Sequence, residues 1–179
     1  MPTGQEGPGA LPRPQSRGLI RQLRWVHDML RRDLAAVRDL ATRVAGGAGT
    51  AEVRADLRGL QSRSLLFQLR ANCLGYCQIV HLHHGHEDAV LFPAVRRAAP
   101  HLADTVDRLE ADHRAVSALL DQIESLADGL ADQSARDGLV VALGTLSTDL
   151  LRHLEFEEQS LEPVLNSWER WPDPPAGRS

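Results

Sequence analysis

Apolar side chains recur every three or four residues along most of the chain, which is the spacing of helices that each bury one face. The pattern predicts a first helix over residues 18–45, ended by two glycines, and a second that ends between residues 85 and 95. Two further helices are predicted over residues 101–128 and 135–161. Because most connections are short, successive helices should run antiparallel. We therefore predict an all-α fold, an up-down-up-down four-helix bundle.

Both ends of the chain lack this periodicity. Residues 1–17 are rich in proline and glycine and residues 167–179 in proline, so we expect a disordered N-terminal arm and a Pro-rich C-terminal tail. Trp168 and Trp171 in that tail could fold back onto the bundle. The folded domain should therefore span residues 18–166.

Composition narrows the class of protein. Aromatic residues make up only 4% of the 179, which favours helices over strands, and the net charge of −4 argues against a dedicated nucleic-acid binder. No apolar run reaches the roughly 18 residues that a membrane span needs. Cys73 and Cys77 are too few for a disulfide framework, and the first residues lack the pattern of a signal peptide. We therefore expect a cytoplasmic protein.

Four of the eight histidines lie on the apolar faces of the four predicted helices. Two of them begin a His-x3-Glu motif, and the motif at His83 aligns with that at His153, with a second acid, a leucine and a proline at matching offsets. Because a buried histidine or glutamate is costly unless it is paired or metal-bound, these positions indicate a function. The candidate metal ligands are His27, His83, Glu87, His113, His153 and Glu157.

The spacing of each motif places its imidazole and its carboxylate on one helix face, about 6 Å apart. Two such pairs that face one another, with two further imidazoles, make a site for two metal ions bridged by two carboxylates. Mixed nitrogen and oxygen donors inside a helix bundle suit iron. The alternatives are a polar core without metal, a zinc site, for which four ligands suffice, and a ferritin-like centre. The Glu-x-x-His spacing of ferritin-like proteins occurs only at Glu110 and His113.

Sequence separations between the histidines test the bundle geometry. Forty positions separate His113 from His153, and their midpoint, residue 133, falls in a predicted turn. Fifty-six positions separate His27 from His83, so the first hairpin carries 16 surplus residues. We expect an inserted short helix or excursion within residues 48–62, between the first two helices and away from the metal.

The six candidate ligands, in this order and with Leu-Phe-Pro at residues 91–93, resemble the hemerythrin-like (HHE cation-binding) family over roughly residues 19–165. The resemblance implies two non-haem iron ions, bridged by carboxylates and an oxo or hydroxo group, that react with dioxygen, peroxide or nitric oxide. Oxygen-carrying hemerythrins use five histidines and two carboxylates. The matching positions in this chain supply four histidines and two carboxylates. A fifth histidine is missing because the positions four residues before and after His113 are Leu109 and Ser117. A pair of iron ions with more coordination positions free of protein ligands favours turnover of a substrate over reversible carriage of dioxygen.

Tyr76 is a candidate for an additional role at the site. It lies seven residues before His83, hence two turns away on the same helix face. Its hydroxyl could bind an iron or donate a hydrogen bond to a bound oxygen species. Alternatively, Tyr76 is a core aromatic residue whose hydroxyl is satisfied by the protein.

Other polar residues cluster around the two motifs. We expect His81, His84 and His86 at the surface or around the ligands, with one of them as an extra ligand in the alternative. Asp88 and Glu158 each follow a predicted bridging glutamate. They should orient imidazoles or face solvent.

Three kinds of function remain open at this stage. We favour a di-iron oxidoreductase, catalase- or peroxidase-like, that removes hydrogen peroxide or nitric oxide. The alternatives are a module that senses dioxygen, nitric oxide or iron, and a store of iron or dioxygen. The expected partner is a small diatomic or peroxide ligand rather than a nucleic acid or a membrane, and the chain should be a monomer or a homodimer.

Overall fold

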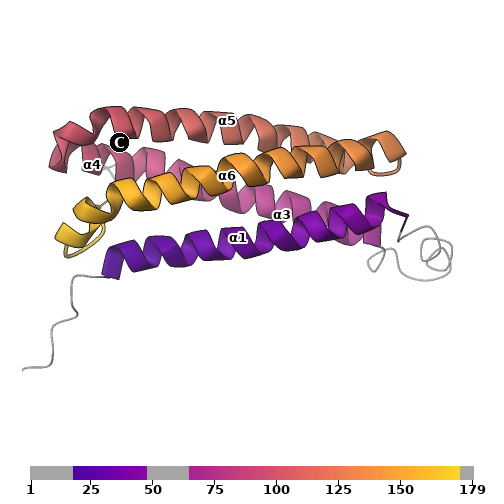
Figure 1. The fold of residues 1–179 in the computed structure, drawn as a ribbon, viewed down its shortest axis with the longest axis horizontal. Helices are drawn as coiled ribbons and strands as arrows, with labels where there is room; N and C mark the ends of the chain where they lie inside the picture. The colour runs from indigo at the N-terminus through magenta and orange to yellow at the C-terminus, as the bar shows by residue number, and fades with distance from the viewer. Residues whose placement is uncertain (1–17, 48–64, 174–179) are drawn as a thin grey trace, which may run out of the picture.

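The computed structural model describes residues 18–47 and 65–173, and all the regular structure in these ranges is helical. Four long helices lie side by side, and successive ones run in opposite directions (Figure 1). The first packs against the second and the fourth, and the third packs against the same two. The predicted all-α four-helix bundle is thus confirmed. The long helices are α1 (Gly18–Ala45), α3 (Leu65–His86), α5 (Ala103–Asp128) and α6 (Gln133–Ser167).

Three segments lie outside the described residues, namely 1–17, 48–64 and 174–179. They include the predicted N-terminal arm, the insertion expected within residues 48–62 and the end of the predicted tail. α1 ends where the sequence predicts, and Gly47 just beyond it has a φ of +90°, which favours glycine. None of the helices in the described part of the chain has the length and apolarity to cross a membrane.

The second of the four long segments of the bundle, residues 65–98, is not a single regular helix. α3 continues into a π-helical turn, η2 (Glu87–Leu91), and then into α4 (Phe92–Ala98). A 3-10 turn, η3 (Pro100–Leu102), leads into α5. A π turn holds one more residue than an α turn, and such turns are frequent at functional sites. This one begins at the glutamate of the first His-x3-Glu motif.

The last helix is longer than the sequence predicts. It continues through Pro163, so the expected end near residue 161 is wrong. Proline removes one backbone hydrogen bond, but Leu161 and Val164 on this part of α6 are buried against apolar neighbours. Packing therefore sustains the helix. Beyond its end, Trp168 and Trp171 pack against the same apolar cluster, as anticipated.

Apolar side chains form two separate clusters along the bundle. On α1, Leu23 belongs to one cluster and Leu30 to the other, and His27 lies between them. On α5, Leu109 and Val116 are divided in the same way on either side of a histidine. A layer of polar side chains thus crosses the core and separates the two clusters.

Candidate metal centre

The polar layer contains all six residues predicted as metal ligands. α1 and α5 each contribute one histidine, whereas α3 with η2, and likewise α6, contribute a histidine and a glutamate one turn later. Five of the six side chains are buried, and His83 keeps 12% of its side chain exposed. The structure therefore brings the whole predicted set together at one level of the bundle. The set is His27, His83, Glu87, His113, His153 and Glu157.

The first half-site consists of His27 and His83 with the carboxylate oxygens that face them. The Nε2 atoms of the two histidines are 3.1 Å apart. His83 Nε2 lies 3.2 Å from Glu87 Oε1, and His27 Nε2 lies 3.5 Å from Glu157 Oε2. One donor atom from each of these four residues falls within 4.8 Å of all the others. A single metal ion could contact all four.

The second half-site consists of His113 and His153 with the facing oxygens of the same two glutamates. The two Nε2 atoms are 3.0 Å apart. Glu87 Oε2 lies 3.6 Å from His113 Nε2, and Glu157 Oε2 lies 3.8 Å from His153 Nε2. Glu87 therefore presents one oxygen to each half-site, and Glu157 Oε2 approaches a histidine in each. Both carboxyl groups lie between the two pairs of imidazoles.

Two further acids form hydrogen bonds to His27 and His113, the lone histidines that belong to neither His-x3-Glu motif. Each of these bonds joins one helical hairpin to the other. The Nδ1 of His27 donates to Glu158 Oε1 at 2.9 Å, and the Nδ1 of His113 donates to Asp88 Oδ1 at 2.8 Å. A proton on Nδ1 leaves the Nε2 lone pair free to bind a metal. We expected these acids either to orient imidazoles or to face solvent, and the structure shows both of them bonded to imidazoles.

Burial determines the charge of the layer. It lowers the pKa of His83 to about 3 and that of His153 to about 4, and it also lowers the pKa of His27 and His113, so the imidazoles are neutral. Burial raises the pKa of Glu157 to about 8. It also raises the pKa of Glu87, helped by the neighbouring charge of Glu157. Neutral imidazole is the form that binds metals.

The two glutamates supply a test of whether a metal fits. Within the described residues, none of the four carboxyl oxygens of Glu87 and Glu157 has a hydrogen-bond partner. Buried carboxyl groups without partners are costly, and a cation between them would remove that cost. Imidazole and carboxylate are also donors that iron accepts. The donor set therefore fits a pair of bridged metal ions.

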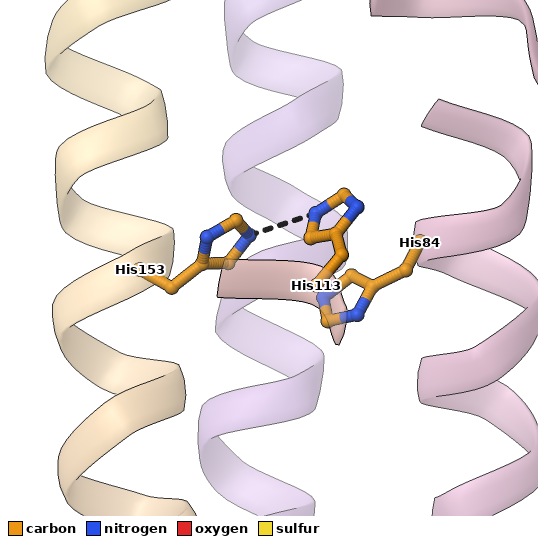
Figure 2. Close-up of side chains that lie close together, drawn as sticks. All are labelled: His84, His113 and His153. Carbon is orange, nitrogen blue, oxygen red and sulfur yellow. Dashed lines mark hydrogen bonds between the residues drawn. The ribbon is translucent and has the colours of Figure 1, made fainter. Parts of the chain in front are cut away.

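The structure distinguishes between the places expected for His84. We expected it, together with His81 and His86, at the surface or around the ligands. His81 is partly exposed and His86 is exposed, whereas the His84 side chain is buried next to the predicted ligands, and its ring stacks on that of His113 with the centroids 3.9 Å apart. It also lies edge-on to the ring of His153 (Figure 2).

A sequence signal for this inward position existed. His84 follows Val80 by four residues and Cys77 by seven, and both of these are buried on the same helix. The buried stripe of α3 is two residues wide here, with His83 near α1 and His84 near α5. The internal repeat pointed to His83 instead, because the alignment of the two motifs pairs His83 with His153 and pairs His84 with Leu154, which is not a metal ligand.

The structure places Tyr76 in the core. Its hydroxyl donates to the backbone carbonyl of Leu30 at 3.3 Å. Leu30 lies one turn beyond His27 on α1, on the side of the larger apolar cluster. This bond satisfies the hydroxyl, as in the second of the two roles considered for Tyr76.

A cavity of about 240 Å³ adjoins the first half-site. Its walls include His83 and Glu87, together with the apolar side chains of Val26, Leu91 and Trp171. The indole Nε1 of Trp171 donates to Gln22 at 2.6 Å, which attaches the C-terminal segment to α1 beside this cavity. Small molecules therefore have space next to the half-site whose histidine is partly exposed.

The comparison with protein families agrees with the fold and the layer. The hemerythrin HHE cation binding domain matches residues 18–165, which is most of the chain. The chain therefore belongs to the hemerythrin HHE cation-binding family. Searches of curated proteins and of solved structures each found no significant match. Family membership and the buried His/Glu clusters together are consistent with metal binding.

Proposed function

We propose that the chain binds two iron ions, one in each half-site, and reacts with a small oxidant, with hydrogen peroxide favoured over nitric oxide and dioxygen. One observation carries the proposal. The carboxyl groups of Glu87 and Glu157 are buried between two pairs of imidazoles, and their oxygens have no hydrogen-bond partner among the described residues. A pair of bridged cations gives all of these atoms a partner.

Each part of the layer has a role in this proposal. The imidazoles of each half-site would hold one ion, and the two glutamates would supply carboxylate oxygens to both. Asp88 and Glu158 fix the rings of His113 and His27, so that each Nε2 points into the layer. The apolar clusters above and below exclude bulk water. When bound, the iron pair supplies redox equivalents and Lewis acidity.

Two arguments favour peroxide. Disproportionation of two molecules of hydrogen peroxide into two of water and one of dioxygen needs no external reductant, whereas reduction of nitric oxide needs an electron donor. In addition, the cavity beside His83 is smaller than the pockets of roughly 300–1,000 Å³ that hold larger ligands. A peroxide or a diatomic molecule suits such a space.

Metal analysis combined with stopped-flow mixing tests the proposal. The protein should hold about two irons per chain, as expected for a site with two bridged positions. The reduced, iron-loaded protein is then mixed separately with hydrogen peroxide, nitric oxide and dioxygen. We expect rapid, repeated turnover of peroxide with release of dioxygen. Fewer than one iron per chain after reconstitution would contradict the proposal.

The same experiment separates turnover from sensing or storage. A stable adduct with dioxygen or nitric oxide, without turnover of peroxide, would identify a carrier or a sensor instead. Glu157→Gln should abolish the reaction by removing a bridge. Glu155→Gln is the matched control, because Glu155 lies on the same helix but is exposed. The control should retain both the iron and the reaction.

A further inference from the structure

The polar layer holds a fifth imidazole outside the six predicted ligands. The side chain of His84 is only 5% exposed, and within the described part of the chain its Nε2 has no hydrogen-bond partner. The rings of His113 and His153 lie beside it, as Figure 2 shows, and the ring of His83 is also near, with its centroid 5.6 Å away. A buried polar atom without a partner is destabilising, so the position calls for an explanation.

The internal repeat shows that an apolar residue fits the equivalent place. The two hairpins match at the motif histidine, at the bridging glutamate and at the acid that follows it. They differ directly after the motif histidine, where the first has His84 and the second has Leu154, which is fully buried in the larger apolar cluster. Burial alone therefore does not require a histidine at this level of the bundle.

The position of His84 makes the two half-sites unequal. One nitrogen from each of His84, His113 and His153 lies within 4.8 Å of the other two. The second half-site thus has three imidazoles in one group, whereas the first has two, His27 and His83. Both half-sites share the same two glutamates.

We propose that His84 is a third imidazole ligand of the metal ion in the second half-site. This inference rests on the proposed function, since it requires a metal in each half-site. The rings of His84 and His113 are nearly parallel, 9° apart, and stacked rings cannot both aim a nitrogen at one ion. Binding therefore requires the His84 ring to turn about its side-chain torsions, which have several allowed settings.

The extra ligand determines where an exogenous molecule binds. Two octahedral ions offer about 12 positions. The second ion, with three imidazoles, has fewer positions left than the first. The first ion adjoins the cavity lined by Val26, Leu91 and Trp171. The small ligand should therefore bind on the His83 side of the layer.

The test compares His84→Leu with wild type and with His81→Leu. Leucine mimics Leu154 of the repeat, and His81 is a partly exposed histidine on the same helix. Metal-free protein is titrated with ferrous iron without oxygen, and the loaded protein is then examined by Mössbauer spectroscopy. In His84→Leu, we expect one of the two ions to bind at least about tenfold more weakly and its spectrum to change. His81→Leu should behave as wild type.

Thermal unfolding adds a readout that distinguishes ligation from packing. Metal-free His84→Leu should melt at or above the temperature of metal-free wild type, because the substitution removes an unpartnered buried nitrogen. Iron-loaded His84→Leu should melt below iron-loaded wild type, because it binds iron more weakly. Two ions bound at wild-type affinity, with an unchanged spectrum, would overturn the role of His84.

A second variant covers the case in which leucine prevents folding. His84→Ala leaves space for free imidazole, which should restore the affinity and the spectrum of the weakened ion. No restoration in a folded, iron-binding variant would also overturn the inference. Failure of the proposed function has a different signature, because wild type itself would then fail to take up two irons.

Discussion

Each half-site contains two of the four predicted histidine ligands, one of them from a His-x3-Glu motif, but the surroundings of the two half-sites differ. In the first, Glu158, which holds His27, also accepts a hydrogen bond from Arg31 at 2.7 Å and lies 3.5 Å from Arg24. In the second, Asp88, which holds His113, keeps 43% of its side chain exposed. An internal repeat can therefore duplicate a ligand set without duplicating its environment.

The difference extends to the charge of the two acids. Burial acts to raise the pKa of Glu158, but hydrogen bonds from His27 and Arg31 outweigh it and hold the pKa below its usual value. Burial and the nearby charge of Glu110 instead raise the pKa of Asp88. The first half-site thus has the more firmly charged acid and the adjoining cavity. The second has the extra imidazole and a fully buried motif histidine.

The largest effect should come from the part that the half-sites share. Glu87→Gln and Glu157→Gln each remove a carboxylate that approaches histidines in both half-sites. We expect either variant to lower the iron content from about two per chain to below one, measured by elemental analysis after reconstitution. Retention of both ions in both variants would show that these carboxylates are not the bridges.

Separate substitution of the two acids that orient the lone histidines should distinguish the half-sites. Glu158→Gln and Asp88→Asn each weaken one hydrogen bond to an imidazole, a change that typically costs about 10–100-fold in metal affinity. We expect the larger loss for Glu158→Gln, because it also removes one of the charged partners of Arg31. Ferrous titration of the two variants measures the difference. Equal losses would mean that the arginines do not strengthen the first half-site.

The pH dependence of the metal-free protein should show the cost of the buried layer. Below pH 6.5 the unfolded chain binds protons at histidines that stay neutral in the folded protein, such as His83 and His153, so the free energy of unfolding falls as the pH decreases toward about 3. Glu157, with its pKa raised to about 8, keeps a proton in the folded protein that the unfolded chain releases above pH 4.5. The contribution of Glu157 to the free energy of unfolding is therefore lost as the pH rises to about 8.

These two opposite trends predict a maximum of stability between about pH 5 and 7 for the metal-free protein. Urea unfolding across pH 4–9 measures it. Because the second half-site buries three imidazoles, His84→Leu should reduce the loss of stability on the acid side. A stability that continues to rise up to pH 9 would contradict the raised pKa of Glu157.

The smallest effect should come from Tyr76, which lies outside both half-sites. Tyr76→Phe removes the hydrogen bond to the Leu30 carbonyl and should cost about 1 kcal/mol in the free energy of unfolding. The iron content and the visible spectrum should not change. Loss of a charge-transfer band in this variant would instead place the tyrosine on an iron.

Local periodicity accounts for what could be predicted. The 3.6-residue repeat determines which side chains share a face, so the helices and the inward direction of the two His-x3-Glu motifs follow from spacing. The same rule applied to α3 would also have turned His84 inward. The end of α6 could not be predicted in this way, because the burial of Val164 against other helices outweighs the effect of Pro163.

Spacing along the chain was enough to predict the helices, the bundle and the six candidate ligands, because helical periodicity and sequence repeat are properties of residues that are near one another in sequence. Tertiary contacts alone establish which acid holds which histidine, since Glu158 and His27 are 131 positions apart. They also place His84 against α5 and the cavity beside His83. Such contacts depend on how separate helices are rotated against one another, which helical periodicity leaves undetermined.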